Sequence, residues 1–442
     1  MAVGIRSSLH PQIDLGTEPR WGRQFHTFGN DSGFVAEVAA AYIEGFQLDR
    51  DLGPGSVATM AKHFPGGGPQ LDGEDPHFPY GREQVYPGGR FDDHLVPFRR
   101  AIEVGTSALM PYYGRPIGLE LDGEAIEGVG FGYNKQILTG LLRDQLGYDG
   151  VICTDWGLIT STVVFGRPLP ARAWGVEHLS ELDRLVKIID AGADQLGGEQ
   201  RTELLVHAVE RGLVTVERID ASVRRLLLVK FQLDLFDDPF VDPDLAEDVV
   251  GRDDFVRAGL RAQAESMVLL QNSTVDGVPT LPLTTPLAVY VEGVSEADAA
   301  RLGEIVADPK DADVAVVRLP SPFDPRDDLF LEGFFHQGSL EYRPGLVARL
   351  RDLAALTPLV IDANLERPAI LTPFTEFAAA ILTDVGASSS ALVAVLSGAV
   401  PPLGRLPFEV PRSTEAVRNS HSDVADDSED PLYPHGAGLR YP

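Results

Sequence analysis

The sequence lacks the features that mark several large classes of protein. It has one cysteine, Cys153, which excludes an internal disulfide and any zinc site built from cysteines. No apolar run approaches the roughly 20 residues that a membrane-spanning helix needs. The first residues show neither the basic start nor the apolar stretch of a secretory signal. We therefore expect a protein of the cytoplasm that does not bind a membrane.

Basic residues are also scarce. The 442 residues hold 37 lysines and arginines against 66 acids, a net charge of −29. Nucleic acids and anionic membrane surfaces would repel such a chain, so neither is an expected partner. An apolar content of 44% is that of an ordinary globular protein, and the length suggests two or three domains.

Motifs for other chemistries are missing as well. The glycines at 66–68 follow Lys62-His63 and not the pattern of a phosphate-binding loop. Histidines and acids do not recur at the spacing of metal ligands, and no Gly-x-Ser-x-Gly turn is present. The sequence therefore predicts no metal site.

The first half alternates short β-rich runs with amphipathic helical patterns, which predicts βα units around a parallel sheet. A complete (β/α)₈ barrel uses about 250 residues. Only about five strands precede the expected domain boundary, so we expect a barrel that lacks two or three units at its N-terminus. The strands are expected near 2–9, 57–63, 107–112, 151–154 and 193–196, and the helices near 34–46, 92–103, 135–146, 177–191, 199–211 and 216–231.

A polar segment with two prolines, at 235–244, predicts the end of the first domain. The expected domains are 1–240, a partial (β/α)₈ barrel, and 241–442, a C-terminal α/β sandwich. Polar residues at 413–429 predict a mobile surface loop. In the second domain we expect strands near 287–291, 313–318, 359–362 and 378–383, with helices near 255–269, 343–356 and 388–396.

Polar side chains follow several of the predicted strands. Asp155-Trp156 ends one strand, Lys62-His63 a second, Tyr112-Tyr113 a third, and Arg20 with Arg23 follows the first. The carboxyl ends of parallel strands form the active sites of barrels, where a carboxylate can attack or ionise a substrate. Three of these have plainer alternatives: Asp155 as a loop cap, Trp156 as a core residue, and Lys62-His63 as a salt-bridged lysine next to a structural histidine.

Taken together, several motifs in collinear order resemble glycoside hydrolase family 3. The resemblance covers nearly the whole chain and favours members with a barrel followed by an α/β sandwich. The motifs are Arg20-Trp21-Gly22-Arg23, Lys62-His63-Phe64-Pro65-Gly66, the segments 95–102 and 138–150, Thr154-Asp155-Trp156, and the segments 218–226, 266–272 and 430–441.

The resemblance implies a retaining, exo-acting β-glucosidase that needs no cofactor, because two carboxylates suffice for the reaction. It implies Asp155 as nucleophile, Arg23, Lys62 and His63 as ligands of the terminal sugar, and Tyr113 beside the nucleophile. Trp156 could pack on the sugar face. The partner would be a small carbohydrate, either a β-glucoside or an oligosaccharide. β-Xylosidase specificity and an inactive, sugar-binding form are the alternatives.

The acid/base of such enzymes usually comes from the second domain, here from the segment 318–336. Glu332 is the first choice, because aromatic neighbours would desolvate it, and Asp324 is the alternative. The incomplete barrel would expose a sheet edge. We therefore expect a marginally stable chain, or a homo-oligomer that covers the edge.

Overall fold

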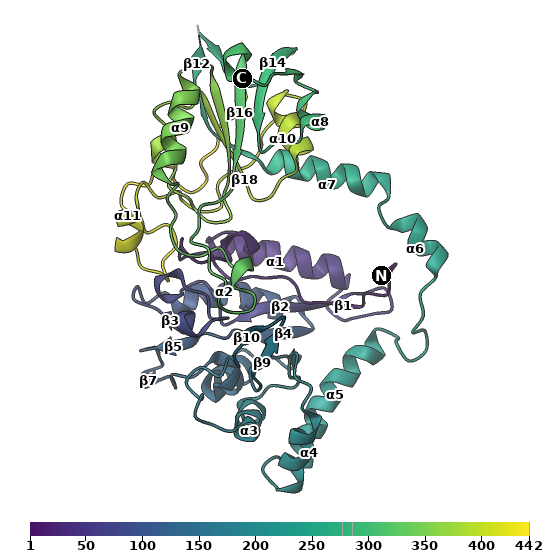
Figure 1. Ribbon diagram of the computed structural model, residues 1–442. Coiled ribbons are helices and arrows are strands. Elements are labelled where there is room, and N and C mark those ends of the chain that lie inside the picture. Colours follow the sequence, from purple (N-terminus) through teal and green to yellow (C-terminus); the bar gives the residue numbers. More distant parts are fainter. Residues whose placement is uncertain (276, 285, 442) are drawn as a thin grey trace. The chain divides into compact units, whose positions relative to one another are not determined.

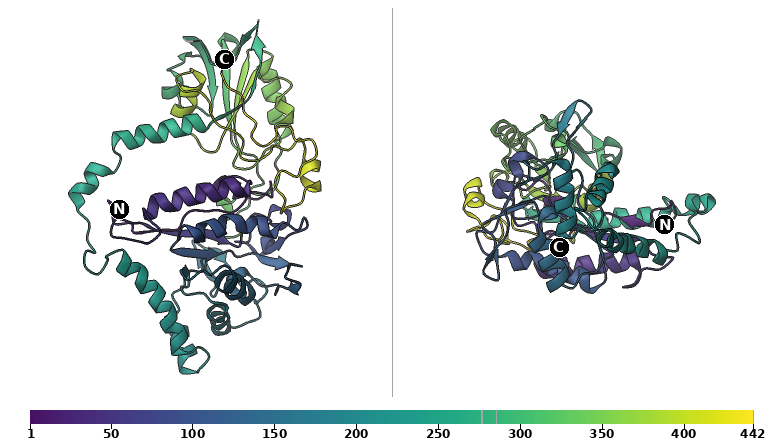
Figure 2. Two further views of the ribbon diagram at one scale, coloured as in Figure 1. Left: turned by 180° about the vertical axis from the view of Figure 1, so that it is seen from behind. Right: turned by 90° about the horizontal axis from the view of Figure 1, so that it is seen from below.

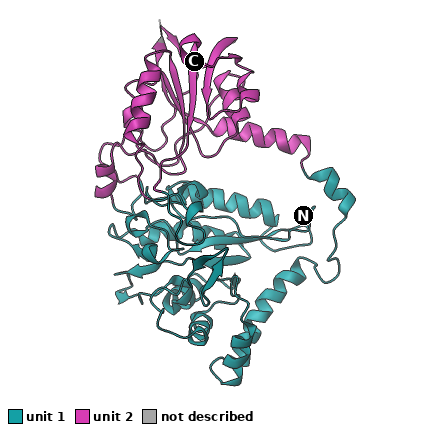
Figure 3. Cartoon of the chain, viewed as in Figure 1, with its two compact units in different colours: residues 1–250, 325–337, 421–425 teal, residues 251–324, 338–420, 426–442 magenta. Residues whose placement is uncertain are grey.

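The computed structural model describes residues 1–275, 277–284 and 286–441, and it divides into two compact units (Figure 3). Unit 1 consists of residues 1–250, 325–337 and 421–425. Unit 2 consists of residues 251–324, 338–420 and 426–442. We expected two continuous domains divided at residue 240, whereas the later segments 325–337 and 421–425 belong to unit 1.

Unit 1 is built on a parallel sheet of four strands in the order β1-β2-β4-β8 (Figure 1). Helices connect the successive strands, so the predicted βα alternation is confirmed. The strands are β1 (Ser7–Ser8), β2 (Ala58–Phe64), β4 (Ala108–Pro111) and β8 (Val151–Ile152), and the helices that follow them are α1 (Ser32–Gln47), α2 (Phe91–Glu103), the π-helical η5 (Gln136–Gln145) and α3 (Glu181–Ala191).

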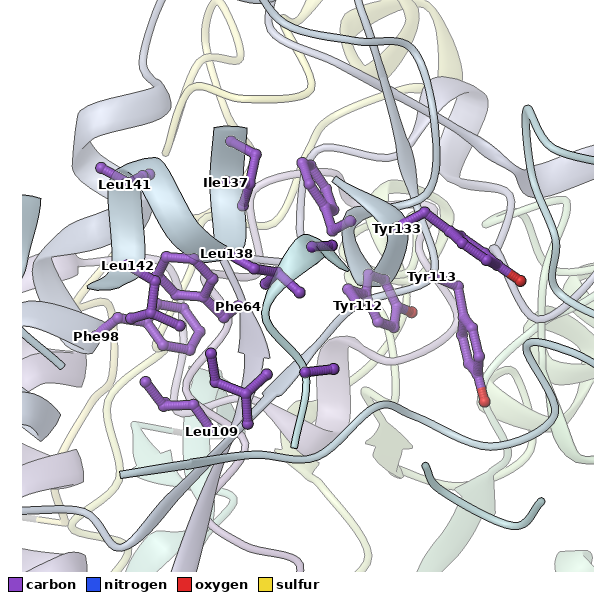
Figure 4. Close-up of a cluster of buried hydrophobic side chains, with 14 of the residues drawn as sticks. Phe64, Phe98, Leu109, Tyr112, Tyr113, Tyr133, Ile137, Leu138, Leu141 and Leu142 are labelled. Carbon is purple, nitrogen blue, oxygen red and sulfur yellow. The ribbon is translucent and has the colours of Figure 1, made fainter. Parts of the chain in front are cut away.

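The strands of unit 1 bury side chains on both faces, as expected for a parallel sheet. Ala61, Leu109 and Ile152 pack with α1, α2, η5 and α3 in the main core. Met110 and Cys153 lie in a second cluster, which helix α5 (Val216–Gln232) helps to cover. Figure 4 shows part of the main core: Phe64, Phe98, Leu109 and Leu142 gather together, and the hydroxyl groups of Tyr113 and Tyr133 point away from them.

Local side-chain caps start several helices. The Oδ1 of Asn134 accepts from the N–H of Ile137 at 3.1 Å, and the Oγ1 of Thr215 accepts from the N–H of Arg218 at 3.2 Å. They satisfy main-chain donors that have no partner inside the helix.

Of the expected strands, the first is shorter than predicted and the one at 193–196 does not form. Of residues 2–9 only Ser7–Ser8 pairs with β2, at the outer position of the sheet. Residues 193–196 form no strand, although Gln195 pairs with Cys153 as an isolated bridge. The reason is that the side chain of Asp194 accepts the N–H of Ile152 at 3.0 Å, in place of a main-chain carbonyl.

The expectation of a mobile loop at 413–429 was wrong. Residues Thr414–Asn419 form the helix α11, and Ser422 and Asp423 are buried. Polar composition misled here because Asp423 is buried and accepts main-chain hydrogen bonds from Gly88 and Arg90.

The remaining elements of unit 1 are short strands and helices around the sheet. They are η1 (Gln24–His26), η2 (Leu71–Gly73), η3 (Pro79–Gly81), β3 (Glu83–Val85), β5 (Arg115–Ile117), β6 (Glu120–Leu121), β7 (Glu124–Ala125), η4 (Phe131–Tyr133), β9 (Thr162–Val164), β10 (Arg167–Leu169), α4 (Thr202–Glu210), α6 (Pro243–Val249) and η7 (Glu332–Phe334). Helices α4 and α5 extend beyond the sheet of unit 1, as the view from behind shows (Figure 2, left).

Unit 2 is a six-stranded sheet in the order β11-β18-β17-β16-β14-β15, parallel except for β11. Alternate residues of the strands enter two apolar clusters, one on each face, with α9 on one side and α7 and α10 on the other. The expected α/β layer structure is confirmed. Its elements are α7 (Asp253–Ser266), β11 (Val268–Asn272), β12 (Thr274–Val275), β13 (Val278–Pro279), β14 (Leu287–Glu292), α8 (Glu296–Ala299), β15 (Gly303–Ile305), η6 (Pro309–Asp311), β16 (Val314–Leu319), α9 (Pro344–Ala354), β17 (Leu359–Asn364), η8 (Thr372–Phe374), β18 (Ala380–Asp384) and α10 (Ser389–Leu396).

In the part of the chain that the structure describes, no helix combines the length and the apolar character needed to cross a bilayer.

Candidate functional site

Asp155 lies just beyond β8, at the carboxyl end of the parallel sheet of unit 1. Its Oδ1 accepts from the N–H of Trp156 at 2.8 Å, and its Oδ2 lies 3.8 Å from the Nε2 of His63. Burial alone would raise the pKa of Asp155, but the neighbouring His63, His77 and Arg23 lower it overall. The carboxyl group is therefore ionised near neutral pH, as a nucleophile must be.

Tyr113 follows β4 and lies beside Asp155. Its hydroxyl donates to the main-chain oxygen of Trp156 at 2.8 Å, and the guanidinium of Arg172 stands 5.5 Å from the ring centre. Burial and the charge of Asp155 raise the pKa of this phenol well above its usual range. Tyr113 is therefore a neutral hydrogen-bonding group beside the carboxylate.

His63 is buried at the end of β2, between an acid and a base. Its Nδ1 lies 2.8 Å from the Oδ2 of Asp14, and its Nε2 lies 3.2 Å from the Nη1 of Arg23. Arginine can only donate, so Nε2 accepts and Nδ1 carries the proton that is donated to Asp14. Burial, together with the nearby Arg23 and Lys62 cations, lowers the pKa of His63 well below its usual range.

Lys62 lies beside this group and is half-buried. Burial and the charge of Arg23 lower the pKa of its ammonium, and the charges of Asp155 and Asp14 oppose that shift. The structure thus brings together four residues predicted from sequence, Arg23, Lys62, His63 and Asp155, from separate segments of unit 1.

The glycines after His63 allow the chain to turn tightly there. Gly66 has a φ of +125°, which side-chain-bearing residues rarely adopt, and a Cβ at Gly67 would lie 2.8 Å from the ring of Tyr112. The N–H of Gly67 also donates to Asp14. A side chain at either glycine would therefore disturb this turn or its packing against Tyr112.

Trp156 is 42% exposed, so its ring is open to a ligand and is not part of the core. The ring lies against Gly197 and Gly198, where any Cβ would be closer than 3 Å to it. The alternative of a core tryptophan is wrong. Its contact with a sugar stays a prediction.

Three residues of the site were missed from sequence: the buried acids Asp14 and Asp75, and the partly buried His77. Asp14 accepts from the N–H and the Nδ1 of His63 and from Gly67. The Oδ1 of Asp75 lies 2.6 Å from the Nδ1 of His77. The signal that could have found Asp14 is a lone acid between two apolar residues, Ile13 and Leu15.

Of these three residues, His77 is one that acts directly on the predicted nucleophile, Asp155. Its ring packs edge-on against Tyr113, with centroids 4.7 Å apart, and its charge is among those that lower the pKa of Asp155. Burial lowers the pKa of His77, and Asp75 and Asp155 oppose this. The imidazole is therefore coupled to both acids.

The two candidates for the acid/base lie in different units. Glu332 belongs to unit 1 and is buried, with Oε1 accepting from the hydroxyl of Tyr80 at 2.9 Å and Oε2 from the N–H of Leu329 at 2.7 Å. Asp324 belongs to unit 2, is exposed, and accepts from the N–H of Ser339 at 2.8 Å. Only Glu332 shares a unit with Asp155.

The comparisons with known proteins agree with this architecture. Residues 1–229 match the glycosyl hydrolase family 3 N terminal domain, and residues 256–441 match the glycosyl hydrolase family 3 C-terminal domain. The chain belongs to glycoside hydrolase family 3. The resemblance inferred from the motifs is therefore confirmed.

Individual relatives of this family 3 chain have β-glucosidase names. It is 46% identical to beta-glucosidase C of Emericella nidulans, over 100% of this chain and 70% of that protein. It is 38% identical to a periplasmic beta-glucosidase/beta-xylosidase of Dickeya chrysanthemi, over 99% of this chain and 68% of that protein. A solved β-glucosidase from Erythrobacter marinus superposes with a TM-score of 0.75 at 25% identity, over 99% of this chain and 66% of that one. The chain thus spans about two thirds of the length of these relatives.

Proposed function

We propose that this family 3 chain is a retaining β-glucosidase that removes terminal, non-reducing β-D-glucosyl residues. One observation carries the proposal: an ionised carboxylate, Asp155, stands at the carboxyl end of the sheet beside Lys62, His63 and Arg23. The ammonium of Lys62 and the guanidinium of Arg23 offer N–H donors to hydroxyls of a sugar, next to a carboxylate that can attack its anomeric carbon. The names of the relatives supply the sugar.

In the proposed first step, a carboxylate oxygen of Asp155 attacks the anomeric carbon and the bond to the leaving oxygen breaks. Glu332 gives its proton to that oxygen, and a covalent glycosyl ester remains on Asp155. In the second step Glu332 takes a proton from water, whose oxygen replaces the ester oxygen at the same carbon. Inversion twice gives net retention, and atoms and charges balance with no metal or cofactor.

The neighbours of Asp155 support this role. The Tyr113 hydroxyl is held against Trp156, and the exposed Trp156 ring can cover one face of the sugar. Arg23 is fixed by Gln12, whose Oε1 accepts from its Nη2 at 2.8 Å. The donors for the substrate hydroxyls are thus oriented before the sugar binds.

A panel of aryl β-glycosides tests the proposal, with release of the phenol as the readout. The glucoside should be cleaved, and Asp155→Asn should lower kcat by at least about 10³-fold while the protein stays folded, because an amide cannot form the ester. A 2-fluoroglucoside should label Asp155 and no other residue. Sugar binding without turnover of any glycoside would favour the inactive, sugar-binding alternative.

The assignment of Glu332 has its own matched test. Glu332→Gln should abolish the hydrolysis of substrates with poor leaving groups and spare activated aryl glucosides in the first step, because these need no proton. Azide should restore turnover by replacing water as the second nucleophile. Asp324→Asn is the control and should leave both substrates unaffected; the reverse pattern would transfer the role to Asp324.

β-Xylosidase activity is the second candidate, because the name of the Dickeya chrysanthemi relative includes it. The ratio of kcat/KM for the aryl glucoside and the aryl xyloside decides between them.

A further inference from the structure

Asp75 connects three segments of unit 1 through its buried carboxylate. Its Oδ2 accepts from the Nε1 of Trp21 at 2.9 Å and from the hydroxyl of Tyr112 at 2.8 Å. Its Oδ1 accepts from both the N–H and the Nδ1 of His77, at 2.9 and 2.6 Å. Any movement of Asp75 would therefore move the imidazole that packs against Tyr113 beside Asp155.

The main chain of Asp75 is held by a residue that lies 262 positions later in the sequence. Its N–H donates to the Oε1 of Gln337 at 2.7 Å, and Gln337 is 1% exposed. The Nε2 of Gln337 donates to the hydroxyl of Tyr80 at 3.3 Å. Because a main-chain N–H can only donate, the orientation of the amide is fixed, with oxygen toward Asp75.

The surroundings of Gln337 are close-packed. A Cβ added at Gly22 would lie 3.0 Å from the oxygen of His336 and 3.2 Å from the Cγ of Gln337. The ring of Phe335 packs on His77 with centroids 4.6 Å apart. Within unit 1, Phe335 therefore packs against His77, and Gln337 binds the main chain of Asp75, whose carboxylate orients His77.

We infer that Gln337 is a positioning residue for catalysis: its side-chain oxygen fixes the main chain at Asp75 and so sets the place of His77 beside Asp155. This inference rests on the proposed function. The segment 325–337, which belongs to unit 1 although it follows residues of unit 2, would then have two functions: it carries Glu332, and it positions His77.

Gln337→Met tests the inference, since methionine has a similar length but neither accepts from Asp75 nor donates to Tyr80. In the full chain, kcat for an aryl β-glucoside should fall at least tenfold, because small misplacements of groups around the reacting atoms cost up to about 10²-fold. KM should change less than kcat. The ¹⁵N and proton signals of the His77 Nδ1–H should shift in NMR spectra.

Gln47→Met is the matched control. Gln47 is also a buried amide that accepts main-chain N–H groups, from Thr59 and Ser107, but it lies at the opposite end of the strands. Gln47→Met should lower the melting temperature and leave both kcat and the His77 signal unchanged. If Gln337→Met does not fold, Gln337→Asn, one methylene shorter, gives the same comparison with a smaller loss of packing.

The outcomes separate the inference from the proposed function. Wild-type kcat within twofold and an unmoved His77 signal in a folded Gln337 variant would overturn the positioning role. So would a Gln337 variant that behaves like Gln47→Met in every readout. A wild-type protein without turnover of any glycoside would refute the proposed function, while the His77 signal would still report on Gln337.

Discussion

At the scale of single residues, Asp14 holds His63 and Gly67 in place within the candidate site. It is fully buried and receives three N–H groups, two from His63 and one from Gly67. Burial raises the pKa of Asp14, and these hydrogen bonds oppose that shift. Its contact with Nδ1 sets the tautomer of His63, which in turn leaves Nε2 free to accept from Arg23.

Replacing Asp14 by Asn should disturb both stability and binding. The amide presents an NH₂ group where only donors face it, so the free energy of unfolding should fall by about 2 kcal/mol. KM for the aryl glucoside should rise about tenfold, because the loss of about one hydrogen bond, roughly 1.4 kcal/mol, weakens binding by that factor. Urea unfolding and steady-state kinetics measure the two effects. Asp190→Asn, an exposed partner of Lys135, is the control and should change stability by under about 1 kcal/mol.

Three imidazoles, the buried His63 and His94 and the partly buried His77, make the stability of the protein depend on pH. Burial lowers the pKa of His63, His77 and His94 below the value of about 6.5 expected in the unfolded chain. Between the folded and unfolded pKa values the unfolded chain binds more protons. Stability is therefore complete above about pH 6.5 and is lost as the pH falls below it.

Each of these histidines should contribute a slope of about 1.4 kcal/mol per pH unit in that window. Urea unfolding measured at about pH 7.5, 6.5 and 5.5 gives the slope. His94→Gln should make the slope shallower by one histidine's share, because it removes one titrating imidazole. A stability that does not change between those pH values would contradict the prediction.

At the scale of secondary-structure elements, helix α2 shows how a distant segment completes a local structure. The residue before the helix, Arg90, provides no side-chain cap. Instead the carboxylate of Asp423 accepts from the N–H of Gly88 and from that of Arg90, both at 2.7 Å. The main-chain oxygen of Asp423 also lies 3.2 Å from the Nε2 of His94 on the same helix.

Removing this cap should destabilise the protein more than removing a local one. We expect Asp423→Ala to lower the free energy of unfolding by about 2 to 3 kcal/mol, because two main-chain donors in part-buried hydrogen bonds lose a charged acceptor. Asp31→Ala, which removes the exposed cap of α1, should cost about 1 kcal/mol. Chemical unfolding of the two variants side by side gives the comparison. Equal losses would mean that Asp423 acts only as an ordinary helix cap.

At the scale of the whole molecule, unit 1 exposes apolar side chains beside an unpaired strand edge. Strand β1 lies at the outer position of its sheet, and Val3 and Ile5 before it are more than half exposed. Helix α5 exposes Leu228 and Phe231 to a similar degree. Such edges and apolar surfaces are commonly covered by another chain or segment.

The homo-oligomer expected from sequence stays a prediction, and this exposed apolar surface is where we expect the copies to meet. Light scattering at micromolar concentration should give a mass above that of one chain. The double variant Leu228→Ser and Phe231→Ser should shift the mass toward the monomer without lowering turnover, because neither residue belongs to the Asp155 group. A wild-type monomer that melts cooperatively above about 60 °C, the upper range for mesophilic domains, would refute it.

The sequence by itself determined the elements and the ends of strands that carry Asp155, Lys62, His63 and Arg23. Helix caps such as Thr215, the alternation of βα units and the family motifs all depend on residues close in the chain, and those can be read from local patterns. The strand expected at 193–196 and the loop expected at 413–429 were wrong, because the side chains of Asp194 and Asp423 accept hydrogen bonds that local patterns assign to the backbone or to water.

Only the tertiary structure decided which side chains support the site. Asp14 meets His63 across 49 residues, Asp75 meets Gln337 across 262, and Gly88 meets Asp423 across 335. No periodicity or spacing specifies such pairs, because they form when the packed sheet and the returning segments exclude water from groups that are distant in the chain. The motifs predicted the chemistry of the site, whereas its geometry and electrostatics depend on burial in the folded chain.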